Sequence, residues 1–132
     1  MNAEALDLWK RAQRSFQTAR QIALEDPDSA ASRAYYAAFS AVSALFALEG
    51  RAFSKHSALE SAVHRDLVKS GIWPRELGSD FSWLIALRST GDYGGKVHVS
   101  SDDVKLAVEK SGRILAAVRE QAPAEFAPGA CQ

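Results

Sequence analysis

The chain has 132 residues, of which 47% are hydrophobic and 24% charged, and this size and composition predict one soluble globular domain. Sixteen basic side chains balance sixteen acidic ones, so the net charge gives no reason to expect strong nonspecific binding to nucleic acid. The one cysteine, Cys131, excludes an internal disulfide. Because the sequence has neither the apolar core of a signal peptide nor a run long enough to span a bilayer, we expect a cytoplasmic protein that does not enter the membrane.

The first predicted helix runs from about Ala3 to Leu24. Residues at steps of three and four form one stripe along it, which is the period of a helix with one buried face. The stripe consists of Leu6, Trp9, Gln13, Phe16, Ala19 and Ala23. Pro27, in the segment EDPDS, cannot continue the helical hydrogen-bond ladder, so the helix should end before it.

The second predicted helix is capped by Asp28 or Ser29 and runs to about Leu48, where Gly50 ends it. One broad face is apolar and the opposite side is rich in small residues. The apolar face consists of Tyr35, Phe39, Val42, Leu45 and Phe46. A helix with so little polar surface is buried on most sides. We therefore expect it at the centre of a bundle, with its second face against another helix or another subunit.

The third predicted helix begins between Ser54 and Ser57 and is closed by Gly71. Ser57 and Glu60 have the spacing of a capping box, in which each side chain caps a backbone N–H of the first turn. Its apolar stripe consists of Leu59, Val63 and Leu67.

The fourth predicted helix begins near Pro74, a residue that suits a first helical turn, and runs to about Ser89. Its stripe consists of Leu77, Phe81, Leu84 and Arg88. Because Arg88 extends an apolar stripe, part of its side chain should be buried. Gly91 is a suitable C-terminal cap.

Ser100 and Asp103 predict the start of a fifth helix. Its stripe consists of Val104, Ala107, Val108, Ile114, Leu115 and Val118. The segment APAEFAPGACQ that follows is rich in Pro and Ala and is predicted to be disordered. Since no segment shows convincing strand alternation, we predict an all-α, up-and-down bundle of about four or five helices. Residues 1–121 would form this domain and residues 122–132 the tail.

Several kinds of site are absent from the sequence. His56, His64 and His98 are its only histidines, and no pair has the four-residue spacing of a helical zinc site, so we expect no structural metal. A Gly-x-Ser-x-Gly nucleophile elbow and a Gly-rich phosphate loop after a strand are also missing. These absences remove the common hydrolase and kinase classes, and no cofactor is implied.

Two stretches remain as candidate sites. In SRAYYAAF, residues 32–39, Arg33 and Tyr36 share a helix face; they are either a surface arginine beside a core aromatic ring or part of a site. In LRSTGDYGG, residues 87–95, Arg88 can simply stabilise the helix end or pair with Asp92. A buried arginine followed by polar and flexible residues equally suits a site for phosphate or another anion.

Together the two stretches resemble the HEPN domain family, in particular its small stand-alone bacterial and archaeal members. Those have SRAYYAAF on the second helix and an Arg-x-x-x-Asp-Tyr segment after the fourth, which here are residues 32–39 and Arg88 with Asp92 and Tyr93. The loop FSKH, residues 53–56, is similar to the family's loop before the third helix. The resemblance covers roughly residues 3–120.

The resemblance implies a helical bundle that usually dimerises and is often encoded beside a minimal nucleotidyltransferase, as a toxin–antitoxin-like pair. Many HEPN domains are metal-independent ribonucleases whose motif is an arginine, about four to six residues and a histidine, with two copies meeting across the dimer. In this chain Tyr93 stands where the histidine is expected, and His98 follows Arg88 only after nine residues. A tyrosine with an ordinary pKa near 10 is a poor general base at neutral pH.

Three functions therefore stay open. The first is a dimeric binding module, in which Arg88 holds a phosphate, nucleotide or RNA, Asp92 orients Arg88, and Tyr93 stacks on the ligand or hydrogen-bonds to it. The second is a metal-independent endoribonuclease with Arg88, Asp92 and Tyr93 as catalytic residues, helped by His56 or His98. The third is a plain helical adaptor in which Arg88 only stabilises its helix end. The candidate ligand-binding residues are Arg33, Tyr36, Lys55, His56 and Arg88.

Overall fold

The computed structural model describes residues 2–93 and 97–126, and it describes side chains for all of these except residues 91–93. The helices are α1 (Ala3–Ile22), α2 (Pro27–Ala47), α3 (His56–Ala62), a π-helical segment η1 (Val63–Val68), α4 (Arg75–Tyr93) and α5 (Ser101–Gln121). The described part of the chain contains no strand, so the predicted all-α fold is confirmed. No helix in that part is long and apolar enough to cross a membrane.

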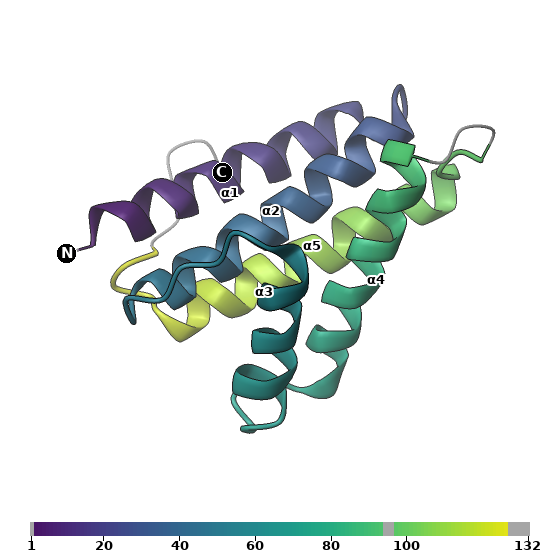
Figure 1. The fold of residues 1–132 in the computed structure, drawn as a ribbon. Coiled ribbons are helices and arrows are strands. Elements are labelled where there is room, and N and C mark those ends of the chain that lie inside the picture. Colours follow the sequence, from purple (N-terminus) through teal and green to yellow (C-terminus); the bar gives the residue numbers. More distant parts are fainter. Residues whose placement is uncertain (1, 94–96, 127–132) are drawn as a thin grey trace.

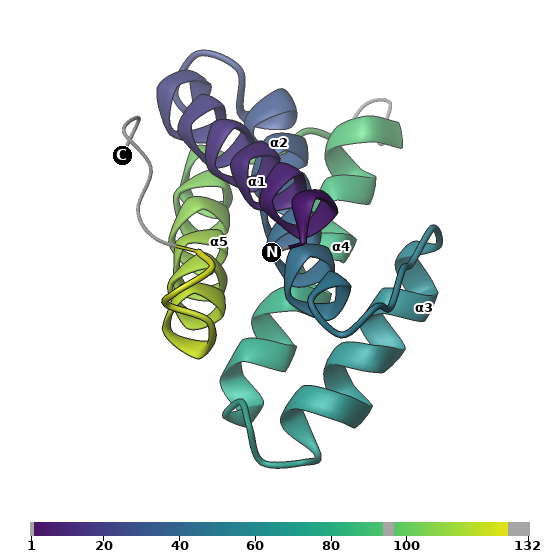
Figure 2. The same ribbon diagram turned by 90° about the vertical axis from the view of Figure 1, so that its left-hand side faces the viewer.

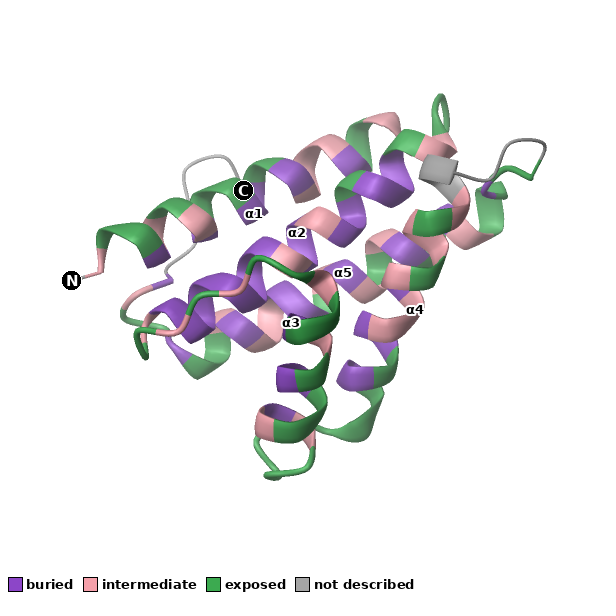
Figure 3. Cartoon of the chain, viewed as in Figure 1, coloured by how far each residue is buried: buried purple, intermediate pink, exposed green. Residues whose placement is uncertain are grey.

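Helix α2 lies at the centre, with α1, α4 and α5 packed around it (Figures 1 and 2). Helix α3 and η1 form a shorter arm that packs against α4 and projects away from the layer of α1, α2 and α5. Figure 3 shows α2 buried along most of its length, as predicted from its lack of charge. The small-residue face is covered within the same chain, since Ala37 and Ala44 are fully buried. The alanine part of that face is therefore not a free surface for a second subunit, whereas Arg33 at its start is exposed.

The start of α2 differs from the prediction. Pro27 is the first helical residue, and the cap is Asp26, whose side chain accepts a hydrogen bond of 3.2 Å from the Ser29 N–H. Proline suits this position because the first N–H groups of a helix have no partner inside the helix. Asp28 instead accepts hydrogen bonds from Val99 N–H and, at 2.7 Å, from the His98 ring. It thus joins the loop before α5 to the start of α2.

The arm formed by α3 and η1 also departs from the prediction. Lys55 precedes α3 and makes no side-chain cap, so the expected capping box of Ser57 and Glu60 does not form. The backbone then loosens into the π-helical turn η1, which the sequence did not predict. Gly71 ends the arm with φ of 90°, a backbone region that favours glycine, as Gly50 does after α2 with φ of 76°.

Helix α4 continues beyond its predicted end near Ser89 and runs through Gly91 to Tyr93. Gly91 is therefore not the C-terminal cap. A glycine inside a helix only weakens it, because a missing Cβ permits but does not require a left-handed turn. As a result Arg88 lies more than a turn before the helix end, and its role cannot be reduced to a charge in the last turn.

The predicted tail begins too early. Residues 122–126 continue past α5 and pack on the bundle, and Phe126 is fully buried, with its ring stacked on Trp9 of α1 at 5.1 Å between centroids. The bulk of a phenylalanine outweighed the Pro/Ala-rich composition on which the prediction depended. Residues 127–132 lie outside the described residues.

A buried carboxylate joins α4 to α5. Asp80 is 4% exposed and accepts hydrogen bonds from Lys110 Nζ at 2.9 Å and Arg113 Nε at 3.1 Å. Removing one member of a buried ion pair leaves the others without their counter-charge. We expect Asp80→Asn to lower the free energy of unfolding by about 2 kcal/mol, below the value for a fully buried pair because Arg113 is half exposed.

Urea denaturation of the Asp80→Asn variant measures this loss. The matched control is Asp7→Asn, which breaks an exposed pair with Arg11 at 3.4 Å and should cost less than about 0.5 kcal/mol. Equal stabilities of the two variants would show that the α4–α5 ion pairs contribute no more than a surface pair does.

Candidate anion-binding site

Four of the predicted site residues meet where α2, α3 and α4 come together. The guanidinium carbon of Arg88, on α4, lies 5.6 Å from the ring centroids of both Tyr35 and Tyr36 on α2. The guanidinium carbon of Arg33, also on α2, lies 5.4 Å from the centroid of the Tyr36 ring. Both arginines thus make cation–π contacts with the tyrosine pair. We call this group, with His56, the Arg88 cluster.

His56 is the first residue of α3 and brings an imidazole into the cluster. Its ring centroid lies 5.3 Å from that of Tyr35, 5.9 Å from that of Tyr36 and 5.0 Å from that of Phe39. Its Nδ1 atom is hydrogen-bonded to the Tyr35 hydroxyl. The site is therefore an aromatic cluster in which the Tyr35 ring is buried and the rings of Tyr36, Phe39 and His56 are half-buried, with guanidinium groups above it.

Burial and charge set the protonation of these rings. Burial raises the pKa of the Tyr35 hydroxyl well above its ordinary value, against the opposing effect of the Arg88 charge, so Tyr35 stays protonated. The pKa of His56 is lowered, first by burial and then by the Arg88 charge, so its imidazole is neutral at pH 7. A protonated hydroxyl beside a neutral imidazole can donate to Nδ1, which leaves the ring proton on Nε2.

The loop before α3 is held by Arg51. Its guanidinium lies 4.7 Å from the ring centroid of Phe46 and 5.3 Å from that of Phe53, and it pairs with Asp66 of η1 at 2.9 Å. Hydrogen bonds from Arg65 and Arg51 lower the pKa of Asp66 to about 2, so the carboxylate stays charged at neutral pH. This anchoring fixes the loop that leads to His56.

A chain of polar groups continues from the cluster along the α3 arm. Glu60 lies one turn after His56, and its charge raises the pKa of Tyr35. The Ser82 hydroxyl on α4 donates to Glu60 Oε2 at 2.6 Å, and His64 Nε2 lies 2.8 Å from the same hydroxyl. The carboxylate that sequence assigned to a capping box thus joins α3 to α4.

The remaining predicted site residues do not all join the cluster. Lys55 is exposed beside His56 in sequence. His98 lies against Asp28, as described above, so His56 is the histidine that contacts the tyrosine pair. The side chains of Asp92 and Tyr93 lie outside the described residues, so their predicted roles stay predictions.

The sequence missed the part played by Tyr35. The helical periodicity of the sequence placed Tyr35 on the apolar face of the second helix, and Tyr35 is indeed fully buried. The adjacent tyrosines of SRAYYAAF were the available indication, because one ring of such a pair must lie near the edge of the core. Its hydrogen bond to His56 spans 21 residues, and no periodicity can reveal a contact of that kind.

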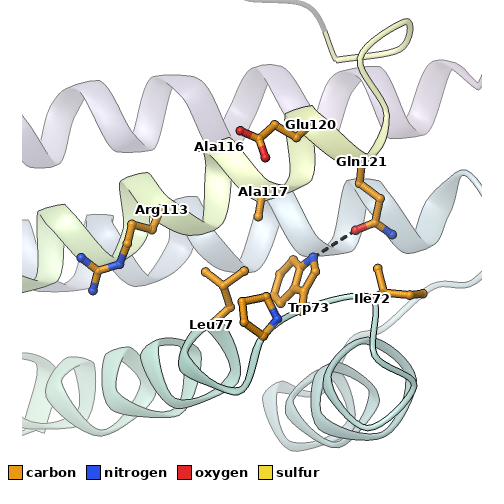
Figure 4. A pocket seen from close by; sticks show the side chains of 9 residues that line it. Ile72, Trp73, Leu77, Arg113, Ala116, Ala117, Glu120 and Gln121 are labelled. Carbon is orange, nitrogen blue, oxygen red and sulfur yellow. Dashed lines mark hydrogen bonds between the residues drawn. The ribbon is translucent and has the colours of Figure 1, made fainter.

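A separate pocket of about 500 Å³ lies between the start of α4 and the end of α5 (Figure 4). It is lined mainly by apolar groups, and the Trp73 indole donates to Gln121 Oε1 at 3.0 Å across one end. None of the predicted ligand-binding residues lines it. Among the described residues no three His, Cys, Asp or Glu side chains are placed to hold a metal ion.

The fold and the cluster define a helical-bundle domain in which an arginine of α4 lies over a tyrosine pair of α2. A HEPN domain model matches residues 5–121, and the chain belongs to the HEPN domain family. It is 35% identical over 117 residues to a "UPF0332 protein" of Thermotoga maritima, an alignment that covers 87% of this chain and 89% of that protein. It is 33% identical over 117 residues to "UPF0332 protein glr0978" of Gloeobacter violaceus, covering 87% and 93%.

The geometry of the cluster predicts a shifted histidine titration. We expect the pKa of His56 to lie below its ordinary value of about 6.5, and Arg88→Ala to raise it only part of the way back, because burial remains. NMR titration of the histidine ring protons in both proteins measures the two values. An identical pKa for His56 in wild type and variant would place the Arg88 charge away from the imidazole.

The same shift gives a pH dependence of stability. The unfolded chain, with the ordinary pKa, binds a proton on His56 at a higher pH than the folded chain does. Stability should therefore fall as the pH is lowered through about 6.5 toward the folded pKa, and His56→Gln should remove this component. Urea denaturation of both proteins at pH 7.5 and 5.5 tests the sign, and a variant that loses as much stability as wild type would contradict it.

Proposed function

We propose that this HEPN protein binds a phosphate-bearing ligand, a nucleotide or single-stranded RNA, at the Arg88 cluster. The observation that carries the proposal is the position of the Arg88 guanidinium over Tyr35 and Tyr36, next to the neutral ring of His56. Guanidinium groups bind phosphate through paired N–H donors, and aromatic rings stack on bases. Since the Tyr35 ring is buried, the partly exposed rings of Tyr36 and His56 offer the stacking surface, next to the charge of Arg88.

Arg33 and Lys55 support this proposal from the edge of the cluster. Both side chains are exposed, and the guanidinium of Arg33 contacts the Tyr36 ring. A neutral chain overall can still bind a polyanion through such a local group of cations. Asp92 and Tyr93 would complete the site, Asp92 by orienting Arg88 and Tyr93 by stacking or hydrogen bonding.

The wider role that we propose follows the resemblance to the small stand-alone HEPN proteins. The protein would act as a homodimer, paired with a minimal nucleotidyltransferase in a toxin–antitoxin-like system in the cytoplasm. Because the small-residue face of α2 is covered by the chain's own helices, the dimer would use another surface. Light scattering at tens of micromolar and co-purification with a co-expressed neighbouring nucleotidyltransferase test this role; a monomer that captures no such partner would refute it.

A second candidate function is metal-independent RNA cleavage. The observation that favours it is His56, a neutral imidazole beside Arg88 in a chain whose motif has Tyr93 in place of histidine. In the tautomer in which Nδ1–H donates to the Tyr35 oxygen, Nε2 of the neutral imidazole is free to take a proton from a 2′-hydroxyl. Arg88 can stabilise charge on the phosphate.

Cleavage of single-stranded RNA in EDTA separates the two functions. An active ribonuclease requires that Arg88→Ala and His56→Ala both lose cleavage. Equal, background cleavage by wild type and both variants would remove the catalytic candidate and leave the binding module. If wild type binds no RNA or nucleotide either, the plain adaptor remains.

A further inference from the structure

A second pocket, of about 240 Å³, lies between α1 and α5, which neighbour one another on the side of the molecule away from α3 (Figure 2). None of the residues of the Arg88 cluster lines it. Its lining combines aromatic, amide and cationic side chains: Trp9, Gln13, Phe16, Gln17, Arg20, Gly112, Leu115, Ala116 and Arg119. This pocket plays no part in the function proposed above.

Gln13 is an unusual residue for its position. It lies in the stripe of α1 that packs on the bundle and is 5% exposed, yet its Nε2 atom is buried with no hydrogen-bond partner in the described structure. Burying an amide donor without an acceptor costs stability. Rotation of the amide about its last bond can turn either polar atom toward the pocket that Gln13 lines. Once turned toward the pocket, Nε2 can donate to an acceptor on a bound ligand.

Gly112, which lines the same pocket, also lowers the local stability of the fold. It lies inside α5, where glycine weakens a helix relative to alanine. A Cβ atom at this position would lie 3.2 Å from Cζ of Phe16, so the missing side chain lets the Phe16 ring lie close to α5. Two residues that weaken the fold locally thus line one cavity, which is the pattern expected where a binding site is maintained.

The charged side chains that line the pocket indicate that its ligand would be an anion. Arg20 and Arg119 line it from α1 and α5, and no carboxylate is among its described lining residues. The guanidinium of Arg20 lies 5.8 Å from the ring centroid of Phe16, so charge and aromatic surface adjoin. Gln17, one turn after Gln13, supplies another amide.

We infer that this pocket binds a small organic anion with a flat apolar body. The anionic group, a carboxylate or a phosphate monoester, would pair with Arg20 and Arg119, and the flat body would lie against Trp9 and Phe16. Gln13 would donate to an acceptor on the ligand. A pocket of about 240 Å³ admits a molecule of the size of a substituted aromatic ring.

Four probes separate the sources of binding: benzoate, phenyl phosphate, inorganic phosphate and benzyl alcohol. We expect benzoate or phenyl phosphate to shift the NMR resonances of the Gln13 side-chain amide and the Trp9 indole saturably at millimolar concentration. Inorganic phosphate has the charge alone and benzyl alcohol the ring alone, so both should bind about tenfold more weakly or not at all. Resonances of Arg88 and His56 report the other site separately, so failure here leaves the function proposed above untouched.

Two variants complete the test. Arg20→Ala, on the exposed side of α1, should weaken the better probe by about tenfold and leave the fold intact, whereas Arg14→Ala should change nothing. Gln13→Leu should weaken the probe and raise the thermal midpoint, because it removes the buried amide; Gln21→Leu, an exposed control, should do neither. The inference is overturned if neither anionic ring shifts these resonances, or if Arg20→Ala binds as wild type does.

Discussion

The substitution Arg88→Ala is expected to weaken binding of single-stranded RNA or of a mononucleotide by about 10-fold to 100-fold. Hydrogen bonds from a charged donor contribute about 1.5–3 kcal/mol, and each 1.4 kcal/mol is a factor of ten in affinity. Alanine leaves the partly exposed Tyr36 ring but removes the guanidinium above it. Fluorescence anisotropy with a labelled oligonucleotide measures the loss.

Urea denaturation of this variant separates loss of binding from loss of the fold. Arg88 contributes cation–π contacts of about 0.5–1 kcal/mol each with two tyrosine rings, which is small against the stability of a folded domain. Arg88→Lys should bind with intermediate affinity, because lysine keeps the charge but not the paired donors. Arg14→Ala, on the exposed face of α1, is the matched control and should bind as wild type does. Equal affinity of Arg88→Ala and Arg14→Ala would contradict the site.

The second large effect concerns stability. We expect Phe126→Ala to lower the free energy of unfolding by about 3–4 kcal/mol, because it removes a fully buried ring and its stacking on Trp9. Truncation after Gln121 should cost at least as much, since it removes the same ring. Urea denaturation measures both losses.

The matched control for this pair is Leu24→Ala, a large apolar side chain that is 76% exposed and should change stability by less than about 0.5 kcal/mol. A truncated protein as stable as the full chain would restore the boundary at residue 121 that the sequence suggested. It would also show that the packing of residues 122–126 adds nothing to the bundle.

Much of the fold was predictable because helical periodicity reports which side of a helix is buried. The stripe residues Phe81, Leu84 and Ile114 are fully buried, and the Ser100 side chain caps α5 as its spacing predicted. Gly50 and Gly71 end their segments with positive φ, which is a local property of the chain. Such features depend on neighbouring residues alone and can be read from sequence.

Helix ends that depend on competition between nearby groups were harder. Asp26 and Asp28 both have carboxylates that can cap α2, and the distant N–H of Val99 decides between them by binding Asp28. Glu60 likewise binds Ser82 of α4 instead of capping its own helix. The end of α4 beyond Gly91 and the π-helical turn η1 have no sequence pattern that separates them from ordinary helix.

The candidate site was predictable only in part. A resemblance to the HEPN family indicated Arg33, Tyr36, His56 and Arg88, and the structure brings these four side chains together. The contribution of Tyr35 depends on tertiary contacts, since its ring joins His56 to Arg88 across three helices. Periodicity treats a buried tyrosine as core and says nothing about its hydroxyl.

The most direct test of the Arg88 cluster as an anion site is an NMR titration of the wild-type protein with AMP. We expect saturable shifts of the Arg88 Nε–H and the His56 ring resonances in the wild-type protein. In Arg88→Ala, AMP should no longer shift the His56 ring resonances. The backbone N–H of Lys105, at the start of α5 and outside the lining of the α1–α5 pocket, should stay unchanged. A titration that leaves Arg88 and His56 unshifted at millimolar AMP, and again with a single-stranded RNA, would contradict the account.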